Sequence, residues 1–419
     1  MDITKTKVLF ISKHAAHATM AMAGNQVFYN TLWNFCQDTR FETAFLTVQK
    51  QSGDFAKMKS TFSPLSKDVS MTLPNRWTTF TYLFYRSFLR VVLSLFRPDW
   101  YLLDPVYRFY FKKAIKKTRK QRFIPDIIVL EWTEVLFLQG FCRRLFPEAK
   151  IVVTEHDVTF TKLERKFAGR NWLQRRLVAP FRNKELEALQ AVDLVRVLSE
   201  DDQSTLLKYH IDRYKIRLVA PFFQKRNLEA SPNTRKQVVF YGALNRLENE
   251  EAVKWFIEKV YMPFRLDRLV SFLVVGGGNA QIKSKYGHIQ GVAFTGYLED
   301  PATVFVESLC MVVPLVNGGG IKIKVLEGMT CSLPVLTNEI GIEGIGGEDG
   351  IEFLYCKTPQ DYEKAVRLLV ERPMLRWDIG NHAREWVNGH FDYQKDLELY
   401  KAELERMGRG VDRKSGDLG

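Results

Sequence analysis

The sequence predicts an α/β protein with two domains, each built on a doubly wound parallel sheet. Short β-branched runs alternate with helical stretches from one end of the chain to the other, which is typical of parallel sheets covered by helices on both faces. The chain has 419 residues, and a single hydrophobic core rarely grows past about 250 to 300 residues. These two observations favour two domains over one.

Five strand-like runs precede a polar segment and five follow it. The first five are VLFIS at 8–12, AFLTV at 44–48, IIVLE at 127–131, IVVT at 151–154 and LVRVL at 194–198. After the polar segment at 226–236, the runs resume with VVFYG at 238–242, FLVVGGG at 272–278, VAFTG at 292–296, MVVPLV at 311–316 and PVLT at 334–337. We therefore expect one domain over 1–225 and another over 237–385, with the loop ends of their strands facing a cleft.

The composition argues against several classes of protein. Hydrophobic residues make up 46% of the chain and charged residues 26%, which is the balance of a globular protein rather than a disordered or fibrous one. The five cysteines are scattered and form no C-x-x-C pair, so neither a disulfide framework nor a zinc ribbon is indicated. The first apolar run is too short for a signal peptide or a membrane span, and we expect a cytoplasmic protein.

The net charge of +13 is concentrated in the first half of the chain. Residues 76–125 hold twelve Lys or Arg against Asp99 and Asp104, a balance of +10, and residues 162–184 have a balance of +7. Such a patch favours nucleic acid, an anionic membrane surface or an acidic polymer as a partner. A solvated basic face without a partner is the alternative.

An apolar, aromatic-rich segment at 76–103 contains Arg86, Arg90 and Arg97. On a helix, at about 100° per residue, the three arginines share one side. A basic stripe on an apolar helix is typical of a segment that lies in a membrane interface, so we assign these arginines to an anionic membrane surface. A core helix with an exposed stripe is the alternative.

The sharpest motif is GGGIKIKVLE at 318–327, directly after the run MVVPLV. A strand, a glycine loop and a helix start form an anion site, and two lysines add positive charge. A carboxylate one to two turns along the helix can accept hydrogen bonds from a ribose diol. The spacing is not that of a P-loop. We predict a nucleotide site, with a glycine-rich turn and solvated lysines as the alternative; its residues are Gly318, Gly319, Gly320, Lys322, Lys324 and Glu327.

Other motifs give weaker signals. The run GGG at 276–278 lacks the G-x-G-x-x-G spacing of a dinucleotide site. His14 and His17 have no acidic or cysteine ligand beside them, so we interpret them as loop histidines rather than a zinc site. In the triplet at 155–157, His156 either shuttles a proton or contacts a sugar hydroxyl, or only neighbours a helix cap. No D-x-D pair stands at a strand end, and we expect no metal.

From Val238 to about Tyr393 the sequence resembles the nucleotide-sugar domain of glycosyltransferase family 4, the group 1 retaining glycosyltransferases with the GT-B fold. The matching segments are VVFYGALNRLENEEAVKWF, FLVVGGG, VAFTGYLED, MVVPLVNGGGIKIKVLEGMTCSLPVLTNEIGIEGI and WVNGHFDYQKDLELYKAEL. The first half resembles the family more loosely, through KVLFIS, Ala23-Gly24-Asn25, TEHDV and ALQAVDLVRVLSEDDQ. The resemblance implies two Rossmann-like domains and a closing helix over 386–407 that returns to the first domain. We expect a disordered tail over 408–419.

The resemblance also implies roles for individual residues. Glu327 would hold the ribose diol, and Lys322 and Lys324 would meet the donor diphosphate and serve catalysis. Gly24 would approach a donor phosphate, and His156 would contact the transferred sugar as a catalytic residue. The residues expected to bind the donor are therefore Gly24, Tyr297, Gly318, Gly319, Gly320, Lys322, Lys324, Glu327 and Glu343.

The chain departs from the family pattern at several positions. Gly319 stands where the family's E-x7-E motif has its first glutamate. Ala243 and Glu248 replace the Arg and Lys of the family's G-R-x-x-x-x-K motif, and Ala23 replaces the first glycine of the first-domain loop. We therefore expect the lysines of the glycine motif to carry more of the phosphate charge.

We expect a retaining glycosyltransferase that moves a sugar from a nucleoside diphosphate sugar to a hydroxyl of a glycan or lipid-linked acceptor. We expect a role in cell-surface polysaccharide or glycoconjugate biosynthesis at the inner face of the cytoplasmic membrane, with no cofactor, no metal and no nucleic acid partner. Two alternatives stay open: a nucleic-acid-binding protein, and a sugar-nucleotide epimerase or phosphorylase on the same fold. The sequence specifies neither the sugar, the base, the acceptor nor the oligomeric state.

Overall fold

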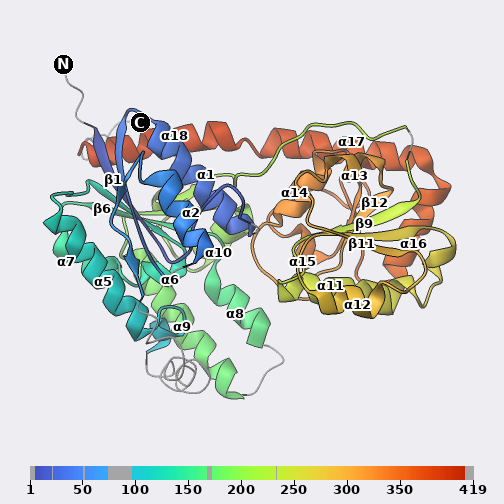
Figure 1. The fold of residues 1–419 in the computed structure, drawn as a ribbon, viewed down its shortest axis with the longest axis horizontal. Helices are drawn as coiled ribbons and strands as arrows, with labels where there is room; N and C mark the ends of the chain where they lie inside the picture. Colours follow the sequence, from blue (N-terminus) through green and yellow to red (C-terminus); the bar gives the residue numbers. More distant parts are fainter. Residues whose placement is uncertain are drawn as a thin grey trace. The chain divides into compact units, whose positions relative to one another are not determined.

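The structure is a computed structural model that describes residues 5–20, 22–50, 52–73, 97–167, 172–232 and 234–410 (Figure 1). The chain divides into two compact units, which we call unit 1 (Met1–Phe222 with Tyr393–Gly419) and unit 2 (Phe223–Asp392). Each unit contains a parallel sheet with helices on its faces, which confirms the predicted fold class. The boundaries between the units lie after Phe222 and after Asp392, whereas the sequence predicts them at 225 and 385.

The sheet of unit 1 has the strand order β3-β2-β1-β5-β6-β7-β8, with β4 also paired to β2. All these pairings are parallel. From β1 the chain adds β2 and β3 on one side, and it then adds β5 to β8 on the other side, so the strand order reverses between β1 and β5. In open parallel sheets, ligands bind beyond the carboxyl ends of the strands at such a reversal. The strands are β1 (Thr6–Ser12), β2 (Phe41–Gln49), β3 (Lys67–Asp68), β4 (Met71–Thr72), β5 (Ile127–Glu131), β6 (Lys150–Glu155), β7 (Leu194–Val197) and β8 (Ile216–Leu218).

Successive residues of the central strands of unit 1 enter two separate cores. Leu9 and Ile11 pack with residues of α5, α7 and α9, whereas Val8 and Phe10 pack with residues of α1, α2 and α18. This is why the strands read as continuous apolar runs. The helices are α1 (Ala23–Gln37), α2 (Gly53–Phe62), η3 (Pro98–Tyr101), α5 (Pro105–Lys120), α6 (Thr133–Leu136), α7 (Gln139–Leu145), α8 (Thr159–Phe167), α9 (Trp172–Gln190), α10 (Glu200–Lys208), η4 (Arg213–Lys215) and α18 (Tyr393–Gly408).

The sheet of unit 2 has the order β11-β10-β9-β12-β13-β14, also with parallel pairings, and it reverses between β9 and β12. Its strands are β9 (Gln237–Tyr241), β10 (Ser271–Val275), β11 (Val292–Gly296), β12 (Cys310–Val313), β13 (Val335–Thr337) and β14 (Leu354–Tyr355). Figure 1 shows α11 and α12 on one face and α13, α14 and α17 on the other. The helices are α11 (Leu247–Phe256), η5 (Ile257–Tyr261), η6 (Leu266–Arg268), α12 (Ala280–Tyr286), α13 (Ala302–Glu307), α14 (Ile323–Met329), α15 (Glu339–Ile342), α16 (Pro359–Glu371) and α17 (Pro373–His390).

The end of the chain differs from the single closing helix expected over 386–407. Helix α17 ends at His390 and α18 begins at Tyr393, because Phe391 leaves the helical region with φ −123° and ψ 87°. The break coincides with the passage of the chain from unit 2 to unit 1, where α18 covers one face of the sheet. Residues 411–419 of the expected tail lie outside the described residues.

Candidate functional site

The chain reversal in unit 1 brings together polar residues that are far apart in the sequence. Glu131 ends β5, Trp132 follows it, and His156 follows β6. In the strand register Glu131 lies beside Ser12 of β1 and Thr154 of β6. His156 therefore stands at the edge of the sheet where a ligand is expected.

His156 is held from two sides. Its Nε2 lies 3.1 Å from Glu131 Oε2, and its ring stacks on Trp132 with 4.1 Å between ring centroids and 10° between ring planes. Its Nδ1 is buried, and within the described part of the chain this atom has no hydrogen-bond partner. The backbone of Trp132 has φ 72° and ψ 152°, a conformation that costs a non-glycine residue about 1 to 3 kcal/mol. The surrounding structure therefore fixes the orientation of the imidazole.

Gly24 lies in the first turn of α1 against the same two rings. A Cβ placed on Gly24 would lie 3.5 Å from His156 Nδ1 and 3.5 Å from Trp132 Cζ2. A longer side chain at this position would occupy the space in front of both rings. The structure thus brings together the two predicted site residues of unit 1.

The two histidines of the first loop serve different carboxylates. His14 Nε2 lies 3.3 Å from Glu134 Oε1, and His17 Nε2 lies 3.1 Å from Asp54 Oδ1. This geometry agrees with the interpretation as loop histidines. Nowhere in the described ranges do three or more His, Cys, Asp or Glu side chains gather as a metal site.

In unit 2 the glycine loop at 318–320 follows β12 and leads into α14. Gly318 and Gly320 have φ values of 137° and 66°, which favour glycine. The buried Lys322 lies against this loop, where its Nζ donates to the Gly320 carbonyl and lies 3.4 Å from Glu343 Oε2. The predicted residues Gly320, Lys322 and Glu343 thus lie together, and Lys322 stabilises the conformation of the glycine loop.

Lys324, the second predicted lysine, contacts α11. Its Nζ donates to Asn249 Oδ1 at 2.6 Å and lies 4.5 Å from the centroid of the Phe240 ring. Burial, followed by repulsion from Arg246 and Lys322, lowers the pKa of Lys324 to about 7. A bound anion would favour the charged ammonium and raise that pKa again.

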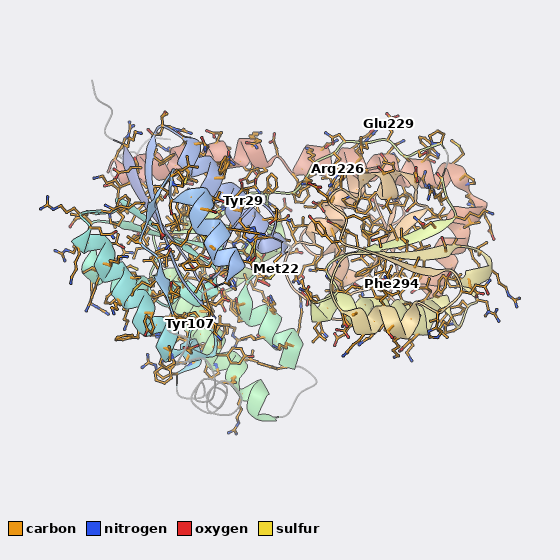
Figure 2. All side chains as sticks on the ribbon, viewed as in Figure 1. Met22, Tyr29, Tyr107, Arg226, Glu229 and Phe294 are labelled. Atoms are coloured by element: carbon orange, nitrogen blue, oxygen red, sulfur yellow. The ribbon has the colours of Figure 1, made fainter. Side chains whose placement is uncertain are left out.

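Glu327 lies in α14, 6% exposed, beside the segment that leads into unit 2. Burial raises the pKa of Glu327 to about 7, opposed by Arg226 and by a backbone hydrogen bond with Gln224. Arg226 pairs with Asp300 at 3.0 Å and is labelled in Figure 2. With a pKa of about 7, the carboxyl group is partly protonated near neutral pH, so a bound ligand can change its protonation state.

Tyr241 neighbours Glu327, and Tyr297 neighbours Tyr241. Burial, followed by the charge of Glu327, raises the pKa of Tyr241 at the end of β9, and Tyr297 is close enough to contribute to the same shift. Tyr297 follows β11 and is 69% exposed. The arrangement places Tyr241 near the predicted ribose acceptor and the exposed Tyr297 near Tyr241.

The GGG run at 276–278 packs two loops of unit 2 together. A Cβ on Gly276 would lie 2.0 Å from the carbonyl oxygen of Gly242, and one on Gly278 would lie 2.7 Å from the amide nitrogen of Asn245. The loop after β10 therefore presses directly on the loop after β9. These glycines therefore serve the close packing of the two loops.

The sequence reasoning missed several charged or polar residues of this region. Arg246 and Asn249 flank Lys324. The sequence offers a signal for Arg246, because it lies three positions beyond Ala243, which stands where the family has its arginine. Arg226 and Asp300 flank Glu327 from distant parts of the chain. No local pattern connects these two residues with the glycine motif.

The expected membrane-facing arginines fall into two groups. Arg86 and Arg90 lie outside the described residues. Arg97 lies just before η3, with its guanidinium 3.5 Å from Asp99 and over the ring of Trp100. Among the helices of the described ranges, none combines the length and the apolar composition that a membrane span requires.

Helix α5 carries a solvent-facing row of residues at helical spacing, which we call the α5 basic stripe. Phe109 in this row is 62% exposed. On the opposite side of the helix, Phe111, Ala114 and Ile115 enter the core. The α5 basic stripe consists of Phe109, Lys113, Lys116, Lys117 and Lys120.

Comparisons with known proteins agree with this architecture. Residues 235–372 match the family model of glycosyl transferases group 1. An uncharacterized glycosyltransferase of Methanocaldococcus jannaschii is 22% identical over 291 residues, which is 64% of this chain and 71% of that protein. Sucrose-phosphate synthase from Thermosynechococcus elongatus has a TM-score of 0.68 at 15% identity, covering 97% of this chain and all of that one. Anabaena HepE in complex with UDP and glucose has a TM-score of 0.65 at 12% identity, covering 95% and 99%.

The two parallel-sheet units thus form a GT-B fold. The chain is a glycosyltransferase whose unit 2 carries the group 1 domain. The resemblance seen in the sequence is confirmed at the level of group 1 glycosyltransferases.

Proposed function

We propose that this protein is a retaining glycosyltransferase of family 4 that moves a sugar from a nucleoside diphosphate sugar to a hydroxyl group. The observation that carries the proposal is the site at the chain reversal of unit 2. There the buried carboxylate of Glu327 lies on the same short helix as the half-buried Lys324, and the pKa values of both groups are moved to about 7. A nucleotide sugar offers a ribose diol to the carboxylate and a diphosphate to the amine.

The phosphate charge in this proposal is met by Lys324, which matches a basic position of the family, and by Arg246, which lies three positions beyond the missing family arginine. Arg246 lies close enough to Lys324 to lower its pKa. Negative charge grows on the diphosphate as the glycosidic bond breaks, and a fixed donor aimed at such charge is typically worth about 10²- to 10³-fold in rate. The family resemblance assigns the proton of the acceptor hydroxyl to the departing phosphate.

The UDP-bound neighbour supports a nucleotide donor, and we propose uridine sugars as the first candidates. The acceptor is proposed to be a glycan or lipid-linked hydroxyl in cell-surface polysaccharide or glycoconjugate biosynthesis. The α5 basic stripe, with an exposed phenylalanine among lysines, supports peripheral binding to an anionic membrane on its cytoplasmic face.

The test begins with thermal shift against UDP-, GDP-, ADP- and CMP-sugars. The best donor is then incubated with a membrane extract, and the anomeric proton of the product is read by NMR. We expect the anomeric configuration of the donor to be kept and transfer to persist in EDTA. An inverted product, or activity that EDTA abolishes and Mg²⁺ restores, would contradict these parts of the proposal.

The same assay separates the competing functions. Conversion of the nucleotide sugar without any acceptor would indicate an epimerase, and a sugar phosphate formed from inorganic phosphate would indicate a phosphorylase. Tight, salt-dependent binding to oligonucleotides with no response to any nucleotide sugar would favour the nucleic-acid alternative.

A further inference from the structure

We propose that Glu131 is a positioning residue that holds His156 in its Nε2-protonated form, so that His156 Nδ1 accepts a hydrogen bond from a hydroxyl of the bound sugar. The role of the sugar rests on the proposed function. The protonation pattern rests only on the geometry of unit 1.

Glu131 is a buried carboxylate with a donor on each oxygen. The residue is 1% exposed, Thr154 donates to Oε1 at 3.2 Å, and His156 Nε2 lies 3.1 Å from Oε2. Removing a carboxylate from water is costly unless donors surround it. Arg196, fully buried, is the register neighbour of Thr154 on β7, so the same row of the sheet also carries a positive charge. The sheet therefore provides a prepared place for the Glu131 carboxylate.

The partner of Nε2 decides where the imidazole carries its proton. A carboxylate oxygen accepts hydrogen bonds, so the proton of this contact belongs to His156 Nε2. In the neutral ring Nδ1 then keeps its lone pair and becomes an acceptor. This is the fixed-tautomer logic by which a carboxylate orients a histidine in many enzymes.

The stacking of Trp132 keeps the ring from turning over. Trp132 stacks on it at 4.1 Å, and the left-handed backbone of Trp132 holds the indole in that place. A ring flip would break the bond to Glu131 and present Nδ1 to a different neighbour. Nδ1 therefore stays on the side of Gly24, whose Cβ position is 3.5 Å away.

The chemistry of Nδ1 selects its ligand. A lone pair in a buried place attracts a group that can donate a proton, and a phosphate diester oxygen has none to donate. A sugar hydroxyl has one. Of the parts of a nucleotide sugar, the transferred sugar therefore fits His156 better than the diphosphate does, and Gly24 leaves the room for it.

The test uses the full chain with ¹⁵N-labelled histidine; its seven histidines keep the NMR spectrum simple. A His156→Gln sample identifies the His156 signals. In the unmodified protein near pH 8 we expect a protonated Nε2 and an unprotonated Nδ1, and this measurement needs no other variant. A proton on Nδ1 would overturn the proposal.

Glu131→Gln is the positioning variant, and Glu134→Gln is its matched control because Glu134 pairs with His14, which also contacts the Trp132 ring. We expect Glu131→Gln to shift the His156 signals toward the other tautomer and Glu134→Gln to leave them in place. An unchanged His156 spectrum in Glu131→Gln would overturn the proposal.

Kinetics complete the test. Loss of a hydrogen bond to a buried acceptor predicts a fall in kcat of about 10- to 100-fold in Glu131→Gln, with the Kd for UDP alone unchanged. Glu134→Gln should retain its kcat. If the tautomer shifts but kcat does not fall, Glu131 does not position His156 for transfer and the proposal fails. If the unmodified protein transfers no sugar, the proposed function fails, and the NMR result still decides the protonation pattern.

Discussion

Among single residues, Glu327 and Lys324 ionise to opposite charges, and burial moves the pKa values of both groups toward pH 7. Burial raises the pKa of Glu327 to about 7 and lowers that of Lys324 to about 7. In the unbound protein, burial therefore disfavours the charged form of both groups. A ligand with complementary groups restores favourable interactions with those charges. Such strain in the unbound protein is common at functional sites.

The first prediction concerns stability and Glu327→Gln. In the folded protein Glu327 keeps its proton between pH 4.5 and about 7, whereas the unfolded chain releases it, so this group lowers stability as pH rises through that window. Glutamine removes the effect. We expect the variant to be more stable than the unmodified protein at pH 8, by at most about 3 kcal/mol, and nearly equal at pH 5. Urea unfolding at both pH values measures this, and equal stability at pH 8 would contradict the burial argument.

The second prediction concerns the pH dependence of donor binding and Lys324→Met. A diphosphate binds best to the charged ammonium, whose pKa in the free protein is about 7. The affinity for the best nucleotide sugar should therefore fall between pH 7 and 9, by at most about tenfold per pH unit. Lys324→Met should bind more weakly and lose this slope. Calorimetry across the range tests it, with Lys254→Met, which removes a surface ion pair with Glu250, as the control. If the affinity of Lys324→Met still falls between pH 7 and 9, the pH dependence belongs to another group.

Among the elements of unit 2, the loops after β9 and β10 depend on close contact between their backbones. Gly276 has φ 149°, and its Cβ position lies 2.0 Å from the carbonyl oxygen of Gly242. Gly277, the next residue, has room for a Cβ at 3.4 Å from Tyr297. The two glycines form a natural pair for comparison.

The third prediction is that Gly276→Ala displaces the loop after β9, lowers the melting temperature and weakens nucleotide binding. The clash with backbone and the positive φ together place the change among the severe substitutions, with a cost of several kcal/mol. Gly277→Ala should change the melting temperature little. Thermal unfolding with and without nucleotide distinguishes them, and similar behaviour of the two variants would contradict the close-packing account.

The elements show which parts of the structure the sequence can predict. The central strands were predicted because strands buried on both faces read as unbroken apolar runs. The edge strands β3, β4, β8 and β14 span two or three residues and leave no periodic signal. The break between α17 and α18 at Phe391 coincides with the passage of the chain between units, and no proline marks it in the sequence.

The site was predictable only where the signal is local. The glycine loop, its lysines and Glu327 form one continuous motif, and the structure brings Lys322 to Gly320 and Glu343. Partners from other strands and loops were missed, because contacts such as Lys324 with Asn249 depend on the tertiary fold. Glu131 was missed for the same reason: its residue type at a strand end gives no hint of His156.

At the scale of the whole molecule, charge distinguishes the two halves of the chain. The net charge of +13 comes from the first half, where the described residues include the α5 basic stripe. The group 1 domain lies in unit 2, within residues 235–372. Membrane binding and donor binding should therefore be separable by mutation.

The fourth prediction tests that separation. Changing Lys113, Lys117 and Lys120 to Glu should release the protein from anionic liposomes, because each basic residue near the surface contributes about 1 kcal/mol. Donor affinity should stay unchanged. The control changes three exposed lysines of unit 2 to Glu, which alters the net charge equally; these are Lys236, Lys283 and Lys364. Equal release by both variants would show that net charge, rather than the stripe, governs liposome binding.

Calorimetric titration of the best nucleotide sugar at pH 8 determines whether unit 2 binds that ligand through Glu327. A hydrogen bond to a charged acceptor contributes about 1.5 to 3 kcal/mol, so Glu327→Gln should raise Kd at least about tenfold. Glu229→Gln, at an exposed position 3.8 Å from Arg384 and labelled in Figure 2, should leave Kd unchanged. Equal affinity of the unmodified protein and Glu327→Gln would exclude Glu327 from the nucleotide site.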